Sequence, residues 1–283
     1  LNHLAPLHNP RALKVIAAAQ KLLPQAQHYA VFDTAFHSTL SLKAKVYALP
    51  YNWYAEKSYQ RFGFHGTNHQ YCAKRAADLV GKAVGELLTV TCHLGNGCSL
   101  CAVKYGTSVD TTMGFTPLEG LMMGSRSGSI DPGLILHLLR QGISLNELDE
   151  ILNKRSGLSG ISGIGNDMRE IIAARGQGHE RAGLAFDMFM HRLVCGISAM
   201  AASLGGLDAV VFSGGIGENA GIVREEACRA LSFLGIELDS NANKITTEDK
   251  VISAGGSRVK VAVVKAREDL AIAEQWRYLS AGR

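Results

Sequence analysis

The chain has 283 residues, of which 47% are hydrophobic and 19% charged, and its formal net charge is +4. This length is sufficient for one large domain or two moderate ones, and the composition is that of a compact protein and excludes a disordered one. The basic residues are scattered, and the tightest clusters are pairs such as Lys154-Arg155. A nucleic-acid binder needs a basic stripe, so no nucleic-acid partner is expected.

Six cysteines lie in apolar segments, at positions 72, 92, 98, 101, 195 and 228. Cys98 and Cys101 have CxxC spacing, but no second CxxC accompanies them, so we expect reduced, mostly buried thiols in a cytoplasmic protein. The first residues contain no apolar core of a secretory signal, and the most apolar run, 193–207, is too short to span a bilayer. No membrane partner is therefore expected.

The spacing of apolar residues predicts alternating helices and strands. In chain order we expect a helix over 11–23, a short buried strand over 29–33, an irregular segment over 36–60, a helix over 69–80, a hairpin with a third strand over 86–112, helices over 132–141 and 145–154, a glycine-rich loop over 156–171 ending in a helix that begins at Asp167, a helix over 179–204, a strand–turn–helix unit over 207–221, a strand over 259–266 and a helix over 268–276. Ser144 and Glu147 have the spacing of a capping box. The fold class is α/β, and the hairpin makes the sheet mixed.

Four glycine-rich turns recur, over 95–97, 124–128, 157–165 and 214–217. The first is sufficient to close a two-stranded hairpin, with no further role. Glycine turns also expose backbone N–H groups, and several that meet at one cleft form a site for an anion. The chain contains neither GxxxxGK[ST] nor GxGxxG, so both interpretations stay open.

Polar side chains within these turns are candidates for chemistry. Arg126 stands between two serines, where it forms either a salt bridge within the loop or a contact to a phosphoryl group. His65 and His69 have HxxxH spacing, but no Glu follows His65, so zinc-protease chemistry is not expected. His93 ends a strand and is either a core histidine or part of a site. Asp33, like Glu268 later in the chain, stands at or just past a strand end, where metal-binding carboxylates are common.

Seven segments, in this order, resemble the acetate/propionate kinase family: APLHNP (5–10), VFDTAFH (31–37), FGFHGTNH (62–69), HLGNG (93–97), SVDTTMGFTPLEGLMMGSRSG (108–128), SGISG with NDMRE (159–163 and 166–170) and FSGGIGEN (212–219). They cover nearly the whole chain. The resemblance implies the two-domain actin-like ATPase (ribonuclease H-like) fold, shared with sugar kinases, actin and the Hsp70 ATPase. Its mixed sheets surround a cleft for ATP, a divalent cation and a short-chain carboxylate.

The resemblance also implies a role for individual residues. The catalytic residues would be Asp33, His65, His93 and Arg126; the nucleotide-binding residues Asn96, Gly97, Asp167, Met168, Arg169, Gly215, Ile216, Gly217 and Asn219; the substrate-binding residues His8 and Phe64; and the metal ligand Glu268. The implied reaction is reversible transfer of the γ-phosphoryl group of ATP to acetate, which gives an acyl phosphate and ADP, with Mg²⁺ or Mn²⁺. A cytoplasmic homodimer is expected.

We expect residues 1–34 to be a remnant of the first domain, against which a C-terminal helix over 271–283 packs, and residues 35–270 to form the second domain with the cleft. The family opens with an Asn-x-Gly-Ser-Ser-Ser-x-Lys turn and carries a second substrate arginine before APLHNP. Neither occurs here, so the resemblance implies an incomplete first domain and an inactive chain when residues 1–283 stand alone.

Three positions depart from the family pattern. Asn68 stands where serine is usual, Ser129 where aspartate is usual, and Lys265-Ala266-Arg267 where a Pro-Thr-Asn run is usual. The alternatives are a propionate or butyrate kinase of the same superfamily, and a non-catalytic nucleotide-binding homologue. The sequence does not distinguish acetate from propionate as the substrate.

Overall fold

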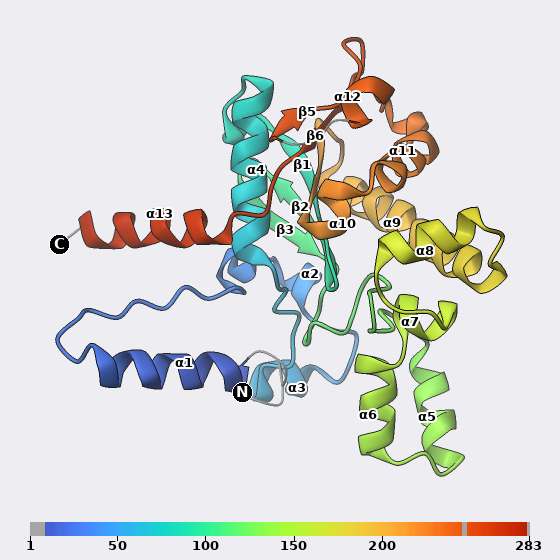
Figure 1. The fold of residues 1–283 in the computed structure, drawn as a ribbon. Helices are drawn as coiled ribbons and strands as arrows, with labels where there is room; N and C mark the ends of the chain where they lie inside the picture. The colour runs from blue at the N-terminus through green and yellow to red at the C-terminus, as the bar shows by residue number, and fades with distance from the viewer. Residues whose placement is uncertain (1–8, 245–247, 282–283) are drawn as a thin grey trace.

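The computed structural model describes residues 9–244 and 248–281, and at its centre is one mixed six-stranded sheet in the order β3-β2-β1-β4-β6-β5 (Figure 1). The strands are β1 Leu88–Leu94, β2 Cys98–Lys104, β3 Thr107–Thr111, β4 Ala209–Ser213, β5 Lys250–Val251 and β6 Lys260–Val263. β1 pairs antiparallel with β2 and parallel with β4, and β4 pairs parallel with β6. The expected hairpin, third strand and mixed sheet are confirmed.

Helices surround this sheet. They are α1 Asn9–Leu22, α2 Leu42–Lys45, α3 Tyr51–Lys57, α4 Gly66–Val80, α5 Pro132–Arg140, α6 Leu145–Lys154, α7 Gly157–Ser162, α8 Met168–Gly176, α9 Glu180–Leu204, α10 Gly214–Asn219, α11 Gly221–Ala230, α12 Ser240–Lys244 and α13 Glu268–Ala281, with short 3₁₀ helices η1 Ala35–Thr39, η2 Val84–Glu86 and η3 Ser232–Leu234. α1 and α13 extend to the same side of the molecule, and the α5–α6 pair projects on the other (Figure 1).

The alternation of side chains along the strands places different helices on the two faces of the sheet. Cys92 and Leu94 of β1 belong to the large core cluster that includes α9 and α11. On the opposite face Cys72 and Ala76 of α4 pack against Val211 of β4. α4 and α9 therefore enclose the sheet from its two sides.

α9 has the length and apolar composition of a helix that could cross a membrane. Its buried residues Phe186, Phe189, Leu193 and Ile197 recur every three or four positions, and all four belong to the large core cluster. That spacing forms the single apolar stripe of a helix that packs on a core. In this structure α9 is therefore the central core helix.

Side-chain caps explain why several helices begin where the sequence predicts. The Ser144 hydroxyl accepts from the Glu147 N–H at 3.2 Å at the start of α6, and the Asp167 carboxylate accepts from the Arg169 N–H at 2.9 Å at the start of α8. These bonds satisfy N–H groups that have no partner within the helix. Both predicted helix starts are confirmed.

The strand predicted over 29–33 is wrong. This segment is neither helix nor strand, and Phe32 is 69% exposed rather than buried. An apolar run forms a strand only beside a partner that takes up its backbone hydrogen bonds, and none of the described residues pairs with it. Asp33 consequently lies just before η1 and not at a strand end.

Other elements were not predicted. The segment expected to be irregular over 36–60 contains η1, α2 and α3, and the glycine-rich segment near 157 contains α7. Each of these helices is short. Helices of one or two turns are stabilised by packing rather than by sequence preference, so periodicity does not reveal them.

Arg224 is a buried arginine that joins three helices. It lies in α11 and is 1% exposed. It donates to the side chain of Asn243 at 2.7 Å, and to the backbone carbonyls of Gly217 and Glu218 at 2.8 Å each. Burial lowers its pKa to about 10, so it remains charged at neutral pH. The charge is accommodated by carbonyl dipoles, and α10 is fixed against α11 and α12 as a result.

We expect Arg224→Met to lower the free energy of unfolding by about 3 kcal/mol, because it leaves several buried carbonyl groups without a donor. The shift of the urea midpoint at constant slope measures this. Arg229→Met on the exposed face of the same helix is the matched control, with an expected change below about 0.5 kcal/mol. Equal changes in both variants would contradict the role assigned to Arg224.

Candidate active site

Two glycine turns meet at the carboxyl edge of the sheet. β1 and β4 run parallel with His93 opposite Ser213, so the turn after β1 and the turn that starts α10 leave the sheet side by side. Gly214 has a φ of +78°, and a Cβ there would lie 2.8 Å from the carbonyl oxygen of Leu94. Only glycine permits this approach.

The turn between β1 and β2 is both a hairpin corner and a contact surface. The N–H of Gly95 donates to the carbonyl of Gly97 at 3.0 Å, which closes the hairpin. A Cβ on Gly97 would lie 2.6 Å from Nη2 of Arg126 and 3.4 Å from Cε1 of His65. The absence of a side chain at Gly97 therefore lets a guanidinium and an imidazole approach the backbone.

Arg126 is buried, and its side chain is not part of a salt bridge with any carboxylate in the described residues. Its Nη1 donates to the carbonyl of Pro117 at 2.6 Å. Burial lowers the pKa of its guanidinium. A buried cation without a counter-charge is costly unless the site binds an anion. The salt bridge that the sequence left open for Arg126 is thus not formed, and an anion site is favoured.

Two histidines stack beside the turn. The rings of His65 and His93 have centroids 4.1 Å apart at an interplanar angle of 27°. His65 has a left-handed φ of 56°, and its N–H donates to the carboxylate of Asp33 at 2.6 Å, which holds this strained residue in place. Burial, only partly offset by the charge of Asp33, lowers the pKa of His93 to about 4. His93 is therefore neutral at pH 7.

Two hydroxyl groups that were not predicted, those of Ser99 and Thr91, contact His65 and His69. The buried Ser99 hydroxyl lies 2.8 Å from Nδ1 of His65 and 2.7 Å from Nε2 of His69. The other nitrogen of His69 lies 2.7 Å from the hydroxyl of Thr91. His69 is thus a buried residue whose two ring nitrogens are both engaged by hydroxyl groups. Ser99 gave no signal in the sequence, because a serine inside a strand resembles any other core position.

A pocket of 670 Å³ adjoins the turn. Its lining includes seven of the nine predicted nucleotide-binding residues: Asn96, Asp167, Met168, Arg169, Gly215, Ile216 and Asn219. The other two do not line it: Gly97 faces Arg126 and His65, and Gly217 is buried in α10. Asn166, Ile172 and Ile222 also line it and were not predicted. Asn96 joins the pocket to the turn, since its Oδ1 accepts from Nδ2 of Asn166 at 3.0 Å.

Glu218 is a further residue that the sequence did not single out. Its carboxylate accepts from the N–H of Gly214 and from the N–H of Ala266, each at 2.9 Å. It therefore joins the segment after β6 to the turn after β4. The signal was available, because Glu218 stands within the FSGGIGEN segment.

The carboxylate of Asp33 lies near enough to Glu268 for its charge to be felt there. Glu268, the first residue of α13, is exposed as a whole, yet the pKa of its carboxyl is raised by desolvation first and by the charge of Asp33 second. Arg267, which the sequence marked as unexpected here, pairs with Asp269 at 3.1 Å instead. Among the described residues no group of three or more His, Cys, Asp or Glu could hold a metal ion.

Of the two predicted substrate residues, the structure describes only Phe64. Phe64 is partly buried against the large core, and its carbonyl accepts from His37 at 3.0 Å. His8 lies outside the described residues. Their predicted roles stay predictions.

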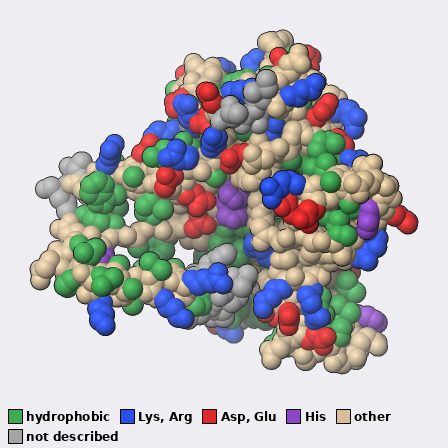
Figure 2. Space-filling view, in the orientation of Figure 1, with side chains coloured by type: hydrophobic (Ala, Val, Ile, Leu, Met, Phe, Trp, Pro, Cys, Tyr) green, Lys and Arg blue, Asp and Glu red, His purple; other side chains and the backbone are tan. Residues whose placement is uncertain are grey.

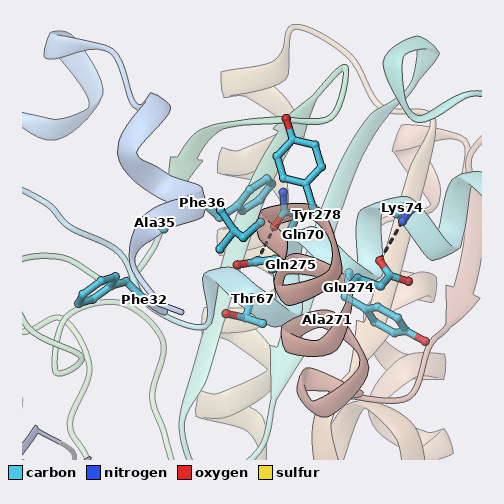
Figure 3. A pocket seen from close by; sticks show the side chains of 12 residues that line it. Phe32, Ala35, Phe36, Thr67, Gln70, Lys74, Ala271, Glu274, Gln275 and Tyr278 are labelled. Carbon is cyan, nitrogen blue, oxygen red and sulfur yellow. Dashed lines mark hydrogen bonds and ion pairs between the residues drawn. The ribbon is translucent and has the colours of Figure 1, made fainter. Parts of the chain in front are cut away.

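A second groove, of 530 Å³, lies between α4 and α13 (Figure 3). None of the predicted site residues that the structure describes lines it. An ion pair between Lys74 and Glu274 at 2.9 Å and a hydrogen bond from Gln275 to Gln70 at 3.3 Å hold α13 against α4. These contacts fix the helix that begins with Glu268.

In the space-filling view, histidine and acidic side chains meet at a hollow in the centre of the face (Figure 2).

The model of the acetokinase family matches residues 1–274. The chain belongs to the acetokinase family. It is 55% identical to an acetate kinase of Synechococcus sp. (strain JA-2-3B'a(2-13)) over 279 residues, which cover 99% of this chain and 69% of that protein. It is 53% identical to an acetate kinase of Nostoc punctiforme over 281 residues, with the same two coverages.

Solved structures of acetokinase-family proteins have the same fold. The Porphyromonas gingivalis acetate kinase superposes with a TM-score of 0.91 at 43% identity, over 95% of this chain and 68% of that one. A propionate kinase from Francisella tularensis gives a TM-score of 0.89 at 39% identity, over 95% of this chain and 68% of that one. The actin-like ATPase fold expected from the resemblance is confirmed, and the protein is a kinase of this family.

We expect Gly97→Ala to lower kcat for phosphoryl transfer by about a hundredfold, because the new methyl group displaces the end of the Arg126 side chain. A side-chain end moves easily, so the free energy of unfolding should change by less than about 1 kcal/mol. Gly85→Ala, where a Cβ meets nothing within 4 Å, is the matched control and should leave kcat unchanged. A wild-type rate for Gly97→Ala would contradict the contact.

Proposed function

We propose that this protein catalyses the reversible transfer of the γ-phosphoryl group of ATP to acetate, which gives acetyl phosphate and ADP. The observation that carries the proposal is the buried Arg126 guanidinium, without a carboxylate partner among the described residues, beside the glycine turn and the two stacked histidines. The relatives named acetate kinase support acetate as the acceptor. A propionate kinase of lower identity keeps propionate as the second candidate.

The chemistry needs positioning and positive charge. The transition state of phosphoryl transfer spreads charge over the equatorial oxygens of the phosphoryl group, and an arginine directed at them stabilises it. Arg126 supplies that charge, and His65 and His93 supply imidazole groups at the same turn. A carboxylate substrate is already ionised at pH 7, so no strong base is required.

The nucleotide is assigned to the pocket beside this turn. Met168 and Ile216 offer apolar surface for the adenine, and Asp167, Arg169 and Asn219 offer polar groups for the ribose. Because Asn96 belongs to both the pocket and the turn, a nucleotide that fills the pocket directs its phosphates toward Arg126. This continuity supports the proposed nucleotide-binding residues.

A divalent cation, Mg²⁺ or Mn²⁺, fits the carboxylates of Asp33 and Glu268. Desolvation first and the charge of Asp33 second raise the pKa of Glu268, and a cation bound between the two carboxylates would offset both effects. Mg²⁺ in kinases is held by one or two carboxylates together with the substrate phosphates, so a pair is sufficient. When bound, the cation would neutralise charge on the β- and γ-phosphates.

The wider organisation is part of the proposal. Residues 1–34 together with the helix over 271–283 would belong to a first domain, and residues 35–270 form the second, nucleotide-binding domain. The parallel projection of α1 and α13 supports this division (Figure 1). The exposed leucines 134, 136 and 139 on α5 support an apolar contact in a homodimer. All six cysteines are free thiols, which supports a cytoplasmic location.

The deciding assay traps acyl phosphate with hydroxylamine in the presence of MgATP and either acetate or propionate. Hydroxamate from acetate at the higher rate is the expected result, and a higher rate with propionate would change the assigned acceptor. No hydroxamate from either acid, in protein that binds ATP, would favour a non-catalytic homologue. Run on residues 1–283 by themselves, the same assay also tests the expectation that these residues alone are inactive.

We expect Arg126→Ala to lower kcat by about a thousandfold and to leave nucleotide affinity nearly unchanged, because the guanidinium contacts the group in transfer rather than the nucleoside. Steady-state kinetics together with ADP binding by calorimetry separate the two effects. Arg126→Lys retains the charge but not the planar donor geometry and should recover only part of the rate. An equal loss of nucleotide binding would show that Arg126 holds the nucleotide.

We expect Glu268→Gln to raise Tm at pH 7 without divalent cations. A raised pKa means that the folded state binds the proton more tightly, so stability falls as pH rises from the ordinary glutamate pKa through the raised one. The gain should vanish at a pH below the ordinary value, where both states are protonated. Added MgCl₂ should raise Tm of the wild type more than that of the variant.

Glu225→Gln on the exposed face of α11 is the matched control for this measurement, and its Tm should stay close to that of the wild type at either pH. If Glu268→Gln were destabilised at pH 7 in the absence of divalent cations, the carboxylate would have a favourable partner, and the proposed cation site would be wrong.

A further inference from the structure

The carboxamide of Asn68 contacts the ring of His93. Asn68 lies in the first turns of α4 and is 0% exposed. Its Nδ2 lies 2.8 Å from Nδ1 of His93 and 3.3 Å from the hydroxyl oxygen of Ser213. An amide nitrogen donates and never accepts, so Nδ1 of His93 must be the acceptor. The neutral ring then carries its proton on Nε2.

The orientation of the amide is set from its other end. The thiol of Cys72, one helical turn further along α4, donates to Oδ1 of Asn68 at 3.6 Å. Burial raises the pKa of this thiol to about 12, so it keeps its proton at neutral pH. A flipped amide would exchange this acceptor for an NH₂ group, to which the sulfur offers only a weak acceptor, and would turn its oxygen toward the ring. The network therefore selects the orientation with Nδ2 toward His93.

The remaining nitrogen of His93 faces the candidate phosphoryl site. A Cβ on Gly95 would lie 3.9 Å from Nε2, so this atom stands over the glycine turn that Arg126 and His65 also approach. In the described residues no hydrogen bond to Nε2 is formed, and the ring is only partly buried. Nε2 is thus a proton donor directed at the place where an anion would lie.

We propose that Asn68 is a positioning residue that holds His93 as the neutral tautomer protonated on Nε2, which donates a hydrogen bond to the phosphoryl group during transfer. The identity of the group that accepts this hydrogen bond rests on the proposed function, whereas the tautomer of His93 rests only on the hydrogen bonds of Asn68. The opposite tautomer would direct a lone pair at the anionic oxygens. Loss of one donor to a developing anion lowers kcat by about a hundredfold to a thousandfold.

The tautomer is measured directly by ¹⁵N–¹H correlation spectra of the chain labelled at histidine. Among the ten histidines, the signals of His93 are those that disappear in His93→Gln. At pH 7 the wild type should show His93 with the proton on Nε2. Asn68→Asp offers only an acceptor to Nδ1, so the proton should move to Nδ1 or the ring should become doubly protonated.

Kinetics connect the tautomer to the reaction. In Asn68→Asp we expect kcat for acyl phosphate formation to fall by about a hundredfold with little change in KM for ATP. Asn68→Ala, which removes the donor without adding charge, should show both tautomers and an intermediate rate. Asn146→Asp, the same change at an exposed position of α6, should leave tautomer and rate unchanged.

Three results would overturn the inference. A wild-type His93 with its proton on Nδ1, or with a charged ring at pH 7, contradicts the hydrogen-bond assignment, even if no variant folds. An unchanged tautomer in both Asn68 variants shows that another group fixes the ring. A changed tautomer with an unchanged kcat shows that the proton position does not affect transfer. Absence of acyl phosphate formation by the wild type would instead bear on the proposed function alone, because the spectra report the tautomer without turnover.

Discussion

The parallel pairing of β1 with β4 is the constraint on which the site depends. It places the end of β1 and the end of β4 at one edge of the sheet, so that the two glycine turns diverge from adjacent positions. The approach of Gly214 to the carbonyl of Leu94 is possible only because neither turn carries a side chain at the contact. Antiparallel pairing of the same strands would place the turns at opposite edges, and neither the pocket nor the Arg126 contact could form.

Few of the side chains at the carboxyl edge of the sheet are charged. Burial keeps His93 neutral and lowers the pKa of His69, while the guanidinium of Arg126 supplies positive charge beside the turn. The carboxylates of Asp33 and Glu268 carry the opposite, negative charge and repel each other. A site with a buried guanidinium that has no carboxylate partner among the described residues, together with two carboxylates that repel each other, is suited to an anionic ligand that arrives with a divalent metal. Binding of the anionic ligand together with the metal would offset both the burial of the guanidinium and the repulsion between the carboxylates.

The sequence could predict those parts of the molecule whose cause is local. The hairpin follows from a glycine turn between apolar runs, and the starts of α6 and α8 follow from Ser144 and Asp167, which cap their own helices. The strand over 29–33 could not be judged in this way, because a strand depends on a partner that local pattern does not reveal. Seven of the residues that line the pocket were singled out from the resemblance. Ser99 was not, since its role lies in contacts between distant segments, whereas Glu218 was overlooked although it stands within the FSGGIGEN segment.

The three departures from the family pattern have structural explanations that differ in consequence. Ser129 only closes its own loop, because its hydroxyl accepts from the N–H of Gly120 at 3.0 Å. Arg267 is paired with Asp269, so its charge does not oppose a cation at Glu268. Asn68 is different in kind, because a serine hydroxyl both donates and accepts, whereas an amide nitrogen only donates. Of the three, the exchange at position 68 therefore acts on the proton of a histidine that faces the site, and it does so without contact between Asn68 and the substrate.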